Sequence, residues 1–267
     1  MIFNIKQYLE RININQPIEA NKEGLFMLHK AHIYNVPFEN FEMQFNQKFG
    51  LNHDFISDRI IRQKKGGLCF ETCMLMANAF DEIGFKYRKY LARVHTPVLT
   101  PATHQIFIVE LEGQNWLFDI GFGAKGPRMP ILLKHGTVAE YSFHSTKIQK
   151  NNIYGWIVSI KENIKPDADW EVIYSFYDHL ATSEDIEMAY HYTMTSNKSL
   201  LKTNRVASLP TKNGRISIRN KTYTEVKDTL ISTQDIDSEE DIFCLIKNKF
   251  GINLTINQLE TMRSNAL

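Results

Sequence analysis

The spacing of apolar residues changes along the chain from a helical period to a strand period. After Asn21, which can cap a helix, apolar residues recur every three or four positions until Pro37. A second helical pattern starts at Cys69, runs to Ile83 and stops at Gly84, a residue type that commonly ends helices. The first part of the chain is therefore predicted to be mostly helical.

Between residues 85 and 190, short runs rich in aromatic and β-branched residues replace the helical pattern. These runs are FKYRKYLARV, HQIFIVEL, WLFDIGF, YGWIVSI and DWEVIYSF. Their length and the turn residues between them predict antiparallel strands. The last part combines a hairpin pattern, NGRISIRNKTYTEV, with helical patterns over 239–250 and 256–263.

This order of elements favours a segregated α+β protein over alternating βαβ units. We expect a helical region over 1–84, a β region over 85–190 and a mixed α/β region over 191–267. The length of 267 residues is sufficient for more than one such region.

The composition excludes several classes of function. Lys and Arg total 31 against 30 for Asp and Glu, so the formal net charge of +1 carries no signature of nucleic-acid or acidic-surface binding. Because no long apolar run or signal-like N-terminal segment is present, we expect neither a membrane span nor a signal peptide. Three cysteines are few and odd in number, which favours a reducing cytoplasm over a disulfide framework.

The segment KKGGLCFETC, residues 64–73, is the first candidate for chemistry. Cys69 opens the second helix, and Cys73 continues its apolar stripe. Free N–H groups and the positive end of the helix dipole favour a thiolate at Cys69. Taken alone, the residues leave three roles open: a core thiol, a metal ligand or a nucleophile. The Cys-x-x-x-Cys spacing lacks the usual zinc pattern, so no metal site is expected.

A nucleophilic cysteine needs a base, and one of the nine histidines has a suitable neighbour. His104 opens one apolar strand, and Asp119 lies within the next, where an unpaired carboxylate would be costly. A two-residue turn at 112–113 would make them diagonal neighbours on one face of a hairpin. If the helix that starts at Cys69 packs on this face, which also carries Ile106, the thiol meets the imidazole.

These segments resemble the arylamine N-acetyltransferase family. The family signature Arg-Gly-Gly-x-Cys-x-Glu is similar to KGGLCFE, with Lys65 in place of the arginine. The family histidine follows a threonine, as in Thr103-His104, and its aspartate lies in a segment like DIGFG, residues 119–123. LHKAHIYNVPFENF resembles a further family stretch, as do ARVHTP and the segment from TSNKSLL to NGRISI.

The resemblance implies a fold and a reaction. The fold would be an N-terminal helical bundle, a central antiparallel β-barrel and a C-terminal mixed α/β lid around a papain-like triad of Cys69, His104 and Asp119. The reaction would be ping-pong acetyl transfer from acetyl-CoA, as co-substrate, through an acetyl-cysteine to an arylamine, arylhydrazine or arylhydroxylamine. No permanently bound cofactor, metal, nucleic acid or membrane partner is implied, and the oligomeric state is left open.

The resemblance also implies binding residues outside the triad. CoA contacts are expected at Thr103, Gly123, Lys125 and Gly126, and acceptor contacts at Phe38 and Phe122. From the residues alone, the glycine-rich loop reads as a turn after a strand, and both phenylalanines read as core.

Three other functions use similar residues. A papain-like or transglutaminase-like enzyme shares the Cys-His-Asp order, an amide synthase would use another thioester, and a binding module would carry an inactive site. The joint presence of PFEN, KGGLCFE and DIGFG argues against the first, and the intact triad argues against the last. The amide synthase is not distinguished by the sequence.

Overall fold

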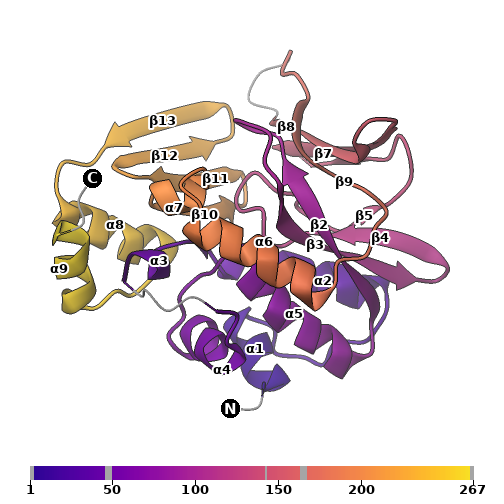
Figure 1. The fold of residues 1–267 in the computed structure, drawn as a ribbon, viewed down its shortest axis with the longest axis horizontal. Helices are drawn as coiled ribbons and strands as arrows, with labels where there is room; N and C mark the ends of the chain where they lie inside the picture. Colours follow the sequence, from indigo (N-terminus) through magenta and orange to yellow (C-terminus); the bar gives the residue numbers. More distant parts are fainter. Residues whose placement is uncertain (1–2, 46–49, 142, 163–166, 265–267) are drawn as a thin grey trace.

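The computed structural model describes residues 3–45, 50–141, 143–162 and 167–264. Its first part is helical, as predicted, and packs beneath the other parts (Figure 1). The helices are α1 (Ile5–Arg11), α2 (Lys22–Asn35), α3 (Glu42–Phe45), α4 (His53–Ser57), the π-helix η1 (Asp58–Arg62) and α5 (Cys69–Ile83).

The two helices predicted from the sequence begin and end where their capping residues indicate. The Asn21 side chain accepts a hydrogen bond from the N–H of Gly24 at the start of α2. Helix α5 ends at Gly84, whose φ of 93° is a left-handed conformation that favours glycine. Both predictions are confirmed.

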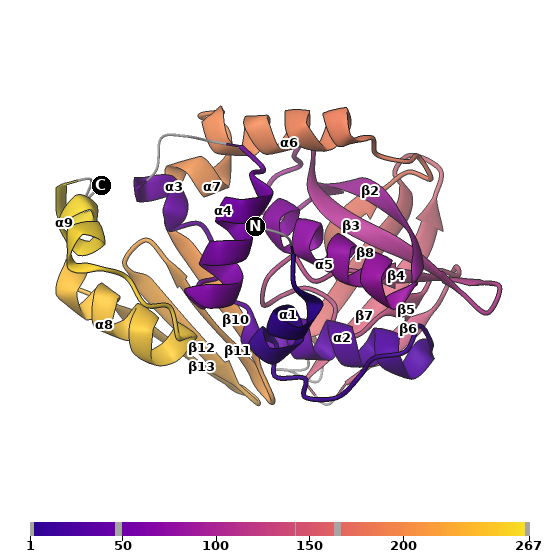
Figure 2. The same cartoon turned by 90° about the horizontal axis from the view of Figure 1, so that it is seen from below.

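The middle of the chain forms one antiparallel sheet that curls into a nearly closed barrel (Figure 2). Its order is β5-β4-β3-β2-β9-β8-β7-β6. The strands are β2 (Lys86–Val94), β3 (Ala102–Leu111), β4 (Gln114–Phe118), β5 (Ile131–Leu132), β6 (Val138–Glu140), β7 (His144–Asn151), β8 (Gly155–Glu162) and β9 (Glu171–Phe176). The predicted β-barrel is confirmed.

The hairpin between β3 and β4 has the predicted register. Leu111 pairs with Gln114, and the turn residues Glu112 and Gly113 both have positive φ, 52° and 71°. This is the primed turn that matches strand twist. Strand β4 ends at Phe118, so Asp119 follows the strand instead of lying within it.

The packing on which the sequence argument was conditional, α5 on the His104 face of β3, is not observed. Ile106 and Ile108 point into the barrel, where they pack with side chains of the other strands. The apolar stripe of α5 packs with Phe107 and Val109, which lie on the opposite face of the same strand. Strand β3 is apolar on both faces, and closure of the barrel leaves the odd-numbered face to the helix.

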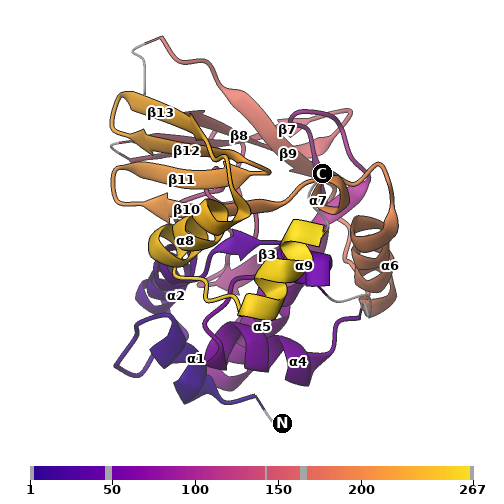
Figure 3. The same ribbon diagram turned by 90° about the vertical axis from the view of Figure 1, so that its left-hand side faces the viewer.

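The strands of the last part form a five-stranded sheet together with β1, and helices accompany it (Figure 3). The strand order is β1-β10-β11-β12-β13. The strands are β1 (Phe38–Glu39), β10 (Val206–Thr211), β11 (Gly214–Arg219), β12 (Thr222–Lys227) and β13 (Leu230–Asp235). The helices are α6 (Ser183–Thr195), α7 (Leu200–Thr203), α8 (Glu239–Phe250) and α9 (Ile256–Ser264). The predicted hairpin and the predicted helix over 239–250 are confirmed.

Two features differ from the predicted regions. The boundary at residue 190 falls inside α6, so residues 183–190 are helical and do not belong to the β region. Strand β1 comes from the helical region but pairs with β10, with Phe38 opposite Ser208. Within the described residues, no helix has the length and apolar character that a membrane crossing needs.

Candidate active site

The three residues predicted to form a triad meet where the helical region touches the barrel. The Nε2 atom of His104 lies 3.0 Å from Oδ2 of Asp119. This leaves the other ring nitrogen for Cys69, whose thiol hydrogen-bonds to the imidazole. All three side chains are buried. The arrangement has the geometry of a nucleophile, a base and a group that orients the base.

Electrostatic attraction stabilises the buried pair of His104 and Asp119. Burial opposes a positive His104, but the charge of Asp119 and hydrogen bonds to Asp119 and Cys69 outweigh it and raise the pKa of His104 to about 10. Burial also opposes ionisation of Asp119, yet His104 and the Gly121 N–H, which donates to Oδ1 at 3.0 Å, lower the pKa of that carboxyl. At neutral pH the thiol therefore faces an imidazolium.

The loop after β4 passes close to Cys69. A Cβ atom on Gly121 would lie 2.5 Å from Cβ of Cys69, so this position requires glycine. On its other side, the Sγ atom lies 3.9 Å from the carbonyl oxygen of Thr103. The thiol is thus held between the start of β3 and the loop that carries Asp119.

Buried aromatic and histidine side chains fix the base and its partner. The His104 ring packs against Phe122 and Tyr174, with centroid distances of 5.2 and 5.1 Å. Burial and the nearby Asp119 charge raise the pKa of Tyr174, so its phenol stays neutral. His29 donates through Nε2 to the backbone oxygen of Asp119 at 2.7 Å, and burial lowers the pKa of His29 to about 4.

A buried ion cluster anchors the segment before Cys69. Nη1 of Arg59 donates to the Gly66 carbonyl oxygen at 2.8 Å and lies 3.3 Å from Glu39, while Nη2 lies 2.6 Å from Glu71. Glu71, in the first turn of α5, accepts from the N–H of Leu68 at 2.8 Å. The Arg59 guanidinium therefore connects β1, the glycine pair Gly66-Gly67 and the first turn of α5.

Arg59 supplies this guanidinium, although the family signature has its arginine at position 65. The Nζ atom of Lys65 lies 3.6 Å from Oε2 of Glu42, at the edge of the same cluster. A lysine cannot reproduce the planar donor fork of an arginine, and Arg59 provides that fork from the π-helix η1. Neither motif nor spacing pointed to Arg59 in the sequence, because its partners are brought together by the fold.

A cavity of about 510 Å³ opens on Cys69. Phe38 and Phe122 line it, as predicted for acceptor contacts, and Thr103 lies in its wall beside His104. The structure therefore brings together the predicted triad, both phenylalanines and one predicted CoA contact.

The other predicted CoA contacts lie elsewhere. Gly123, with φ of 85°, leaves room for Ser208, and its carbonyl oxygen accepts from the N–H of Gly126 at 2.9 Å. Lys125 forms an ion pair with Glu171 at 2.9 Å. Of the described residues that line the cavity, none belongs to the stretch from Gly123 to Gly126. A contact between this loop and CoA stays a prediction.

Sequence reasoning missed the residues that reach the cavity from the last part of the chain. Tyr192, the exposed Lys198 and Ser199 all line it. The segment TSNKSLL was recognised only as a family-like stretch, and no spacing linked it to the triad. In the described part of the chain, no group of three or more His, Cys, Asp and Glu side chains is arranged to hold a metal ion.

Comparison with known proteins agrees with this fold. A family model described as N-acetyltransferase matches residues 23–259, which is most of the chain. The arylamine N-acetyltransferase of Escherichia coli K12 is 33% identical over 132 residues, covering 48% of this chain and 47% of that protein. A Salmonella typhimurium arylamine N-acetyltransferase / N-hydroxyarylamine O-acetyltransferase is 28% identical over 63% of this chain and 59% of its own length.

The alignments therefore span less than two thirds of either of these two curated relatives. The solved structure of Mycobacterium marinum arylamine N-acetyltransferase in complex with CoA has a TM-score of 0.87 at 20% identity, covering 98% of this chain and 99% of that one. The chain belongs to the arylamine N-acetyltransferase family.

Replacing Arg59 with Met should lower the free energy of unfolding by about 3–5 kcal/mol, because it leaves the buried Glu39 and Glu71 without their shared cation. Arg62 in the same π-helix provides the control, since its pair with Asp58 is solvent-exposed and its loss should cost less than about 1 kcal/mol. Urea denaturation measures both. Equal losses in the two variants would contradict the anchoring role of Arg59.

Replacing His104 with Gln should destabilise the protein most at low pH. The raised pKa of His104 means that its charged interaction with Asp119 contributes fully below about pH 6.5 and is lost as the pH rises through about 10. Urea denaturation of both proteins between about pH 6 and 10 should show a shrinking difference. His191→Gln, at an exposed position, should show no comparable trend. A difference that grows with pH would contradict the charged pair.

Proposed function

We propose that the protein transfers an acetyl group from acetyl-CoA to an arylamine, arylhydrazine or arylhydroxylamine through an acetyl-cysteine at Cys69. The observation that carries the proposal is the buried Cys69–His104–Asp119 arrangement, in which an imidazolium lies against the thiol. An imidazolium beside a cysteine at a helix N-terminus stabilises the thiolate, which attacks thioesters readily.

In the first half-reaction the Cys69 sulfur attacks the carbonyl carbon of acetyl-CoA. The carbon–sulfur bond to CoA then breaks, and the CoA thiolate takes its proton from His104. Glu71 and Thr72 already donate their N–H groups to the Leu68 carbonyl oxygen, so we propose that the N–H groups of Cys69 and Phe70, at the start of α5, hold the oxyanion. The products are free CoA and an acetyl thioester on Cys69.

In the second half-reaction the acceptor amine attacks this thioester. Its nitrogen forms the new amide bond while neutral His104 takes the amine proton, and the carbon–sulfur bond to Cys69 breaks. Asp119 keeps the imidazole oriented and stabilises its charged form in both steps. Phe38 and Phe122 line the cavity, and we propose that they pack against an aromatic acceptor.

The same cavity offers groups suited to CoA. Lys198 is an exposed cation that suits a phosphate, and Ser199 is a hydroxyl donor. The Mycobacterium marinum relative of the same fold binds CoA in its solved structure. We propose that Thr103, Gly123, Lys125 and Gly126 contact CoA as well, with Lys125 exchanging its pair with Glu171 for a phosphate.

We propose that the helical region over 1–84, the barrel strands within 85–190 and the mixed region over 191–267 act as a nucleophile bundle, a base-bearing barrel and a lid, with α6 crossing the last boundary. The cavity supports this, because Cys69, His104 and Ser199 line it from the three regions respectively. The reducing cytoplasm is the proposed location, since Cys69, Cys73 and Cys244 are all free thiols.

Incubation with acetyl-CoA should add one acetyl group to the intact protein, which mass spectrometry of the undigested chain detects. Cys69→Ala should remove the adduct. Cys244→Ser should keep it, because that exposed thiol lies outside the cavity, and Cys73→Ala should keep it because Cys73 is fully buried in the α5 stripe.

An adduct that persists in Cys69→Ala would refute the assigned nucleophile. A folded wild-type protein that stays unmodified by acetyl-CoA, but is acylated by another thioester, would favour the amide synthase. Adding aniline to the acetylated protein should release the group as acetanilide and regenerate the thiol.

A further inference from the structure

A second cavity lies outside the barrel, between β2 and α6. Leu91 and Arg93, two residues apart on β2, face it, and the strand partners of Arg93, Ala102 and Ser175, line its floor. Its volume is about 460 Å³, within the range of sites for small ligands. We call it the α6 groove.

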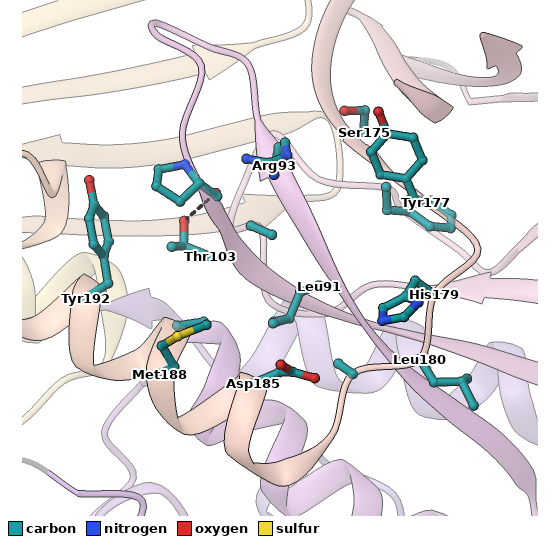
Figure 4. Close-up of a pocket in the computed structure, with 15 residues that line it drawn as sticks. Leu91, Arg93, Thr103, Ser175, Tyr177, His179, Leu180, Asp185, Met188 and Tyr192 are labelled. Carbon is teal, nitrogen blue, oxygen red and sulfur yellow. Dashed lines mark hydrogen bonds between the residues drawn. The ribbon is translucent and has the colours of Figure 1, made fainter. Parts of the chain in front are cut away.

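One face of α6 forms the opposite wall. Asp185, Met188, Ala189 and Tyr192 recur at helical spacing along it. Figure 4 shows Asp185, Met188 and Tyr192 along the helix, with Leu91 and Arg93 along the strand across the groove.

The rim of the α6 groove is unusually apolar for an exposed surface. Tyr177, Leu180 and Met188 are 52%, 54% and 68% exposed, and all three line the groove. Single exposed apolar side chains are common on protein surfaces, but several large ones around one cavity indicate a binding surface. The ligand should therefore have an apolar body.

The charges of the groove indicate the other part of the ligand. Arg93 is exposed, and within the described ranges no side chain forms a hydrogen bond or ion pair with its guanidinium. The carboxylate of Asp185 is engaged, because it accepts from both the N–H and the hydroxyl of Thr182 at 2.9 Å. Among the described residues that line the groove, Arg93 is therefore the cation that no side chain pairs with.

We propose that the α6 groove binds a small aromatic carboxylate or sulfonate, with its ring against Leu91 and Met188 and its anionic group on Arg93. The site is separate from the cavity on Cys69 but shares a wall with it, formed by Pro101, Thr103 and Tyr192. A ligand there contacts the segment that leads into His104. The binding itself requires no acetyl transfer, so it stands independently of the proposed reaction.

Naphthalene-2-sulfonate, titrated by calorimetry, tests this proposal. Arg93→Gln should weaken binding about fivefold, the loss expected for one solvent-accessible ion pair. Lys198→Gln is the matched control, because Lys198 is the exposed cation of the Cys69 cavity, and it should change the dissociation constant by less than about twofold.

Two further measurements separate the charge from the apolar surface. Naphthalene-2-methanol, which has the same ring and no charge, should bind Arg93→Gln and wild type equally. Met188→Glu should weaken binding of both compounds, because it places a carboxylate on the apolar wall. Circular dichroism establishes that each variant is folded.

The proposal is overturned if Lys198→Gln weakens sulfonate binding and Arg93→Gln does not, since the ligand would then occupy the Cys69 cavity. Equal losses of the sulfonate and the alcohol in Arg93→Gln would overturn the anionic class. No binding of the sulfonate to the folded wild-type protein at millimolar concentration would overturn the site.

Discussion

The position of the thiol depends on one buried cation. A guanidinium removed from water is costly unless charges and carbonyl oxygens surround it, and Arg59 obtains these from β1, the glycine pair and the first turn of α5. Two glycines in succession restrict the backbone little, so the segment between η1 and α5 depends on such contacts to hold one conformation. Satisfying Arg59 therefore also places Cys69 at the start of its helix.

The nucleophile and the base come from opposite sides of one strand. The α5 stripe covers the outer face of β3, whereas the His104 ring packs with Phe122 and Tyr174. Cys69 and His104 meet at the end of β3, because His104 lies near the first residue of that strand. The chain after Phe118 then turns and places Asp119 behind the imidazole. Neither the helical region nor the barrel contains the complete arrangement, so the site is a product of their packing.

Local chemistry explains which features could be predicted from the sequence. Asn21, Gly84 and the Glu112-Gly113 turn each favour one backbone conformation, and the hairpin register followed from the last of these. That register predicted that His104 and Asp119 lie close together, although the chain leaves the strand after Phe118, before it reaches Asp119.

Other features depended on tertiary packing. Strand β3 is apolar on both faces, so periodicity could not show which side α5 covers. The partners of Arg59 are 7 to 20 residues away along the chain and converge only in the fold. Helix α6 did carry a local signal, since Thr182 and Asp185 form a capping box, but the aromatic-rich strands before it obscured this.

The pairing of β1 with β10 has a consequence for how the protein is made. A chain leaving the ribosome exposes Cys69, His104 and Asp119 long before residue 206, yet Phe38 of β1 bridges both Gly67 and Ser208. Since domains form largely in the order of synthesis, the nucleophile's loop gains its last neighbouring strand only near the end of translation. The environment of the Cys69 thiol is therefore completed late, when most of the chain has already been synthesised.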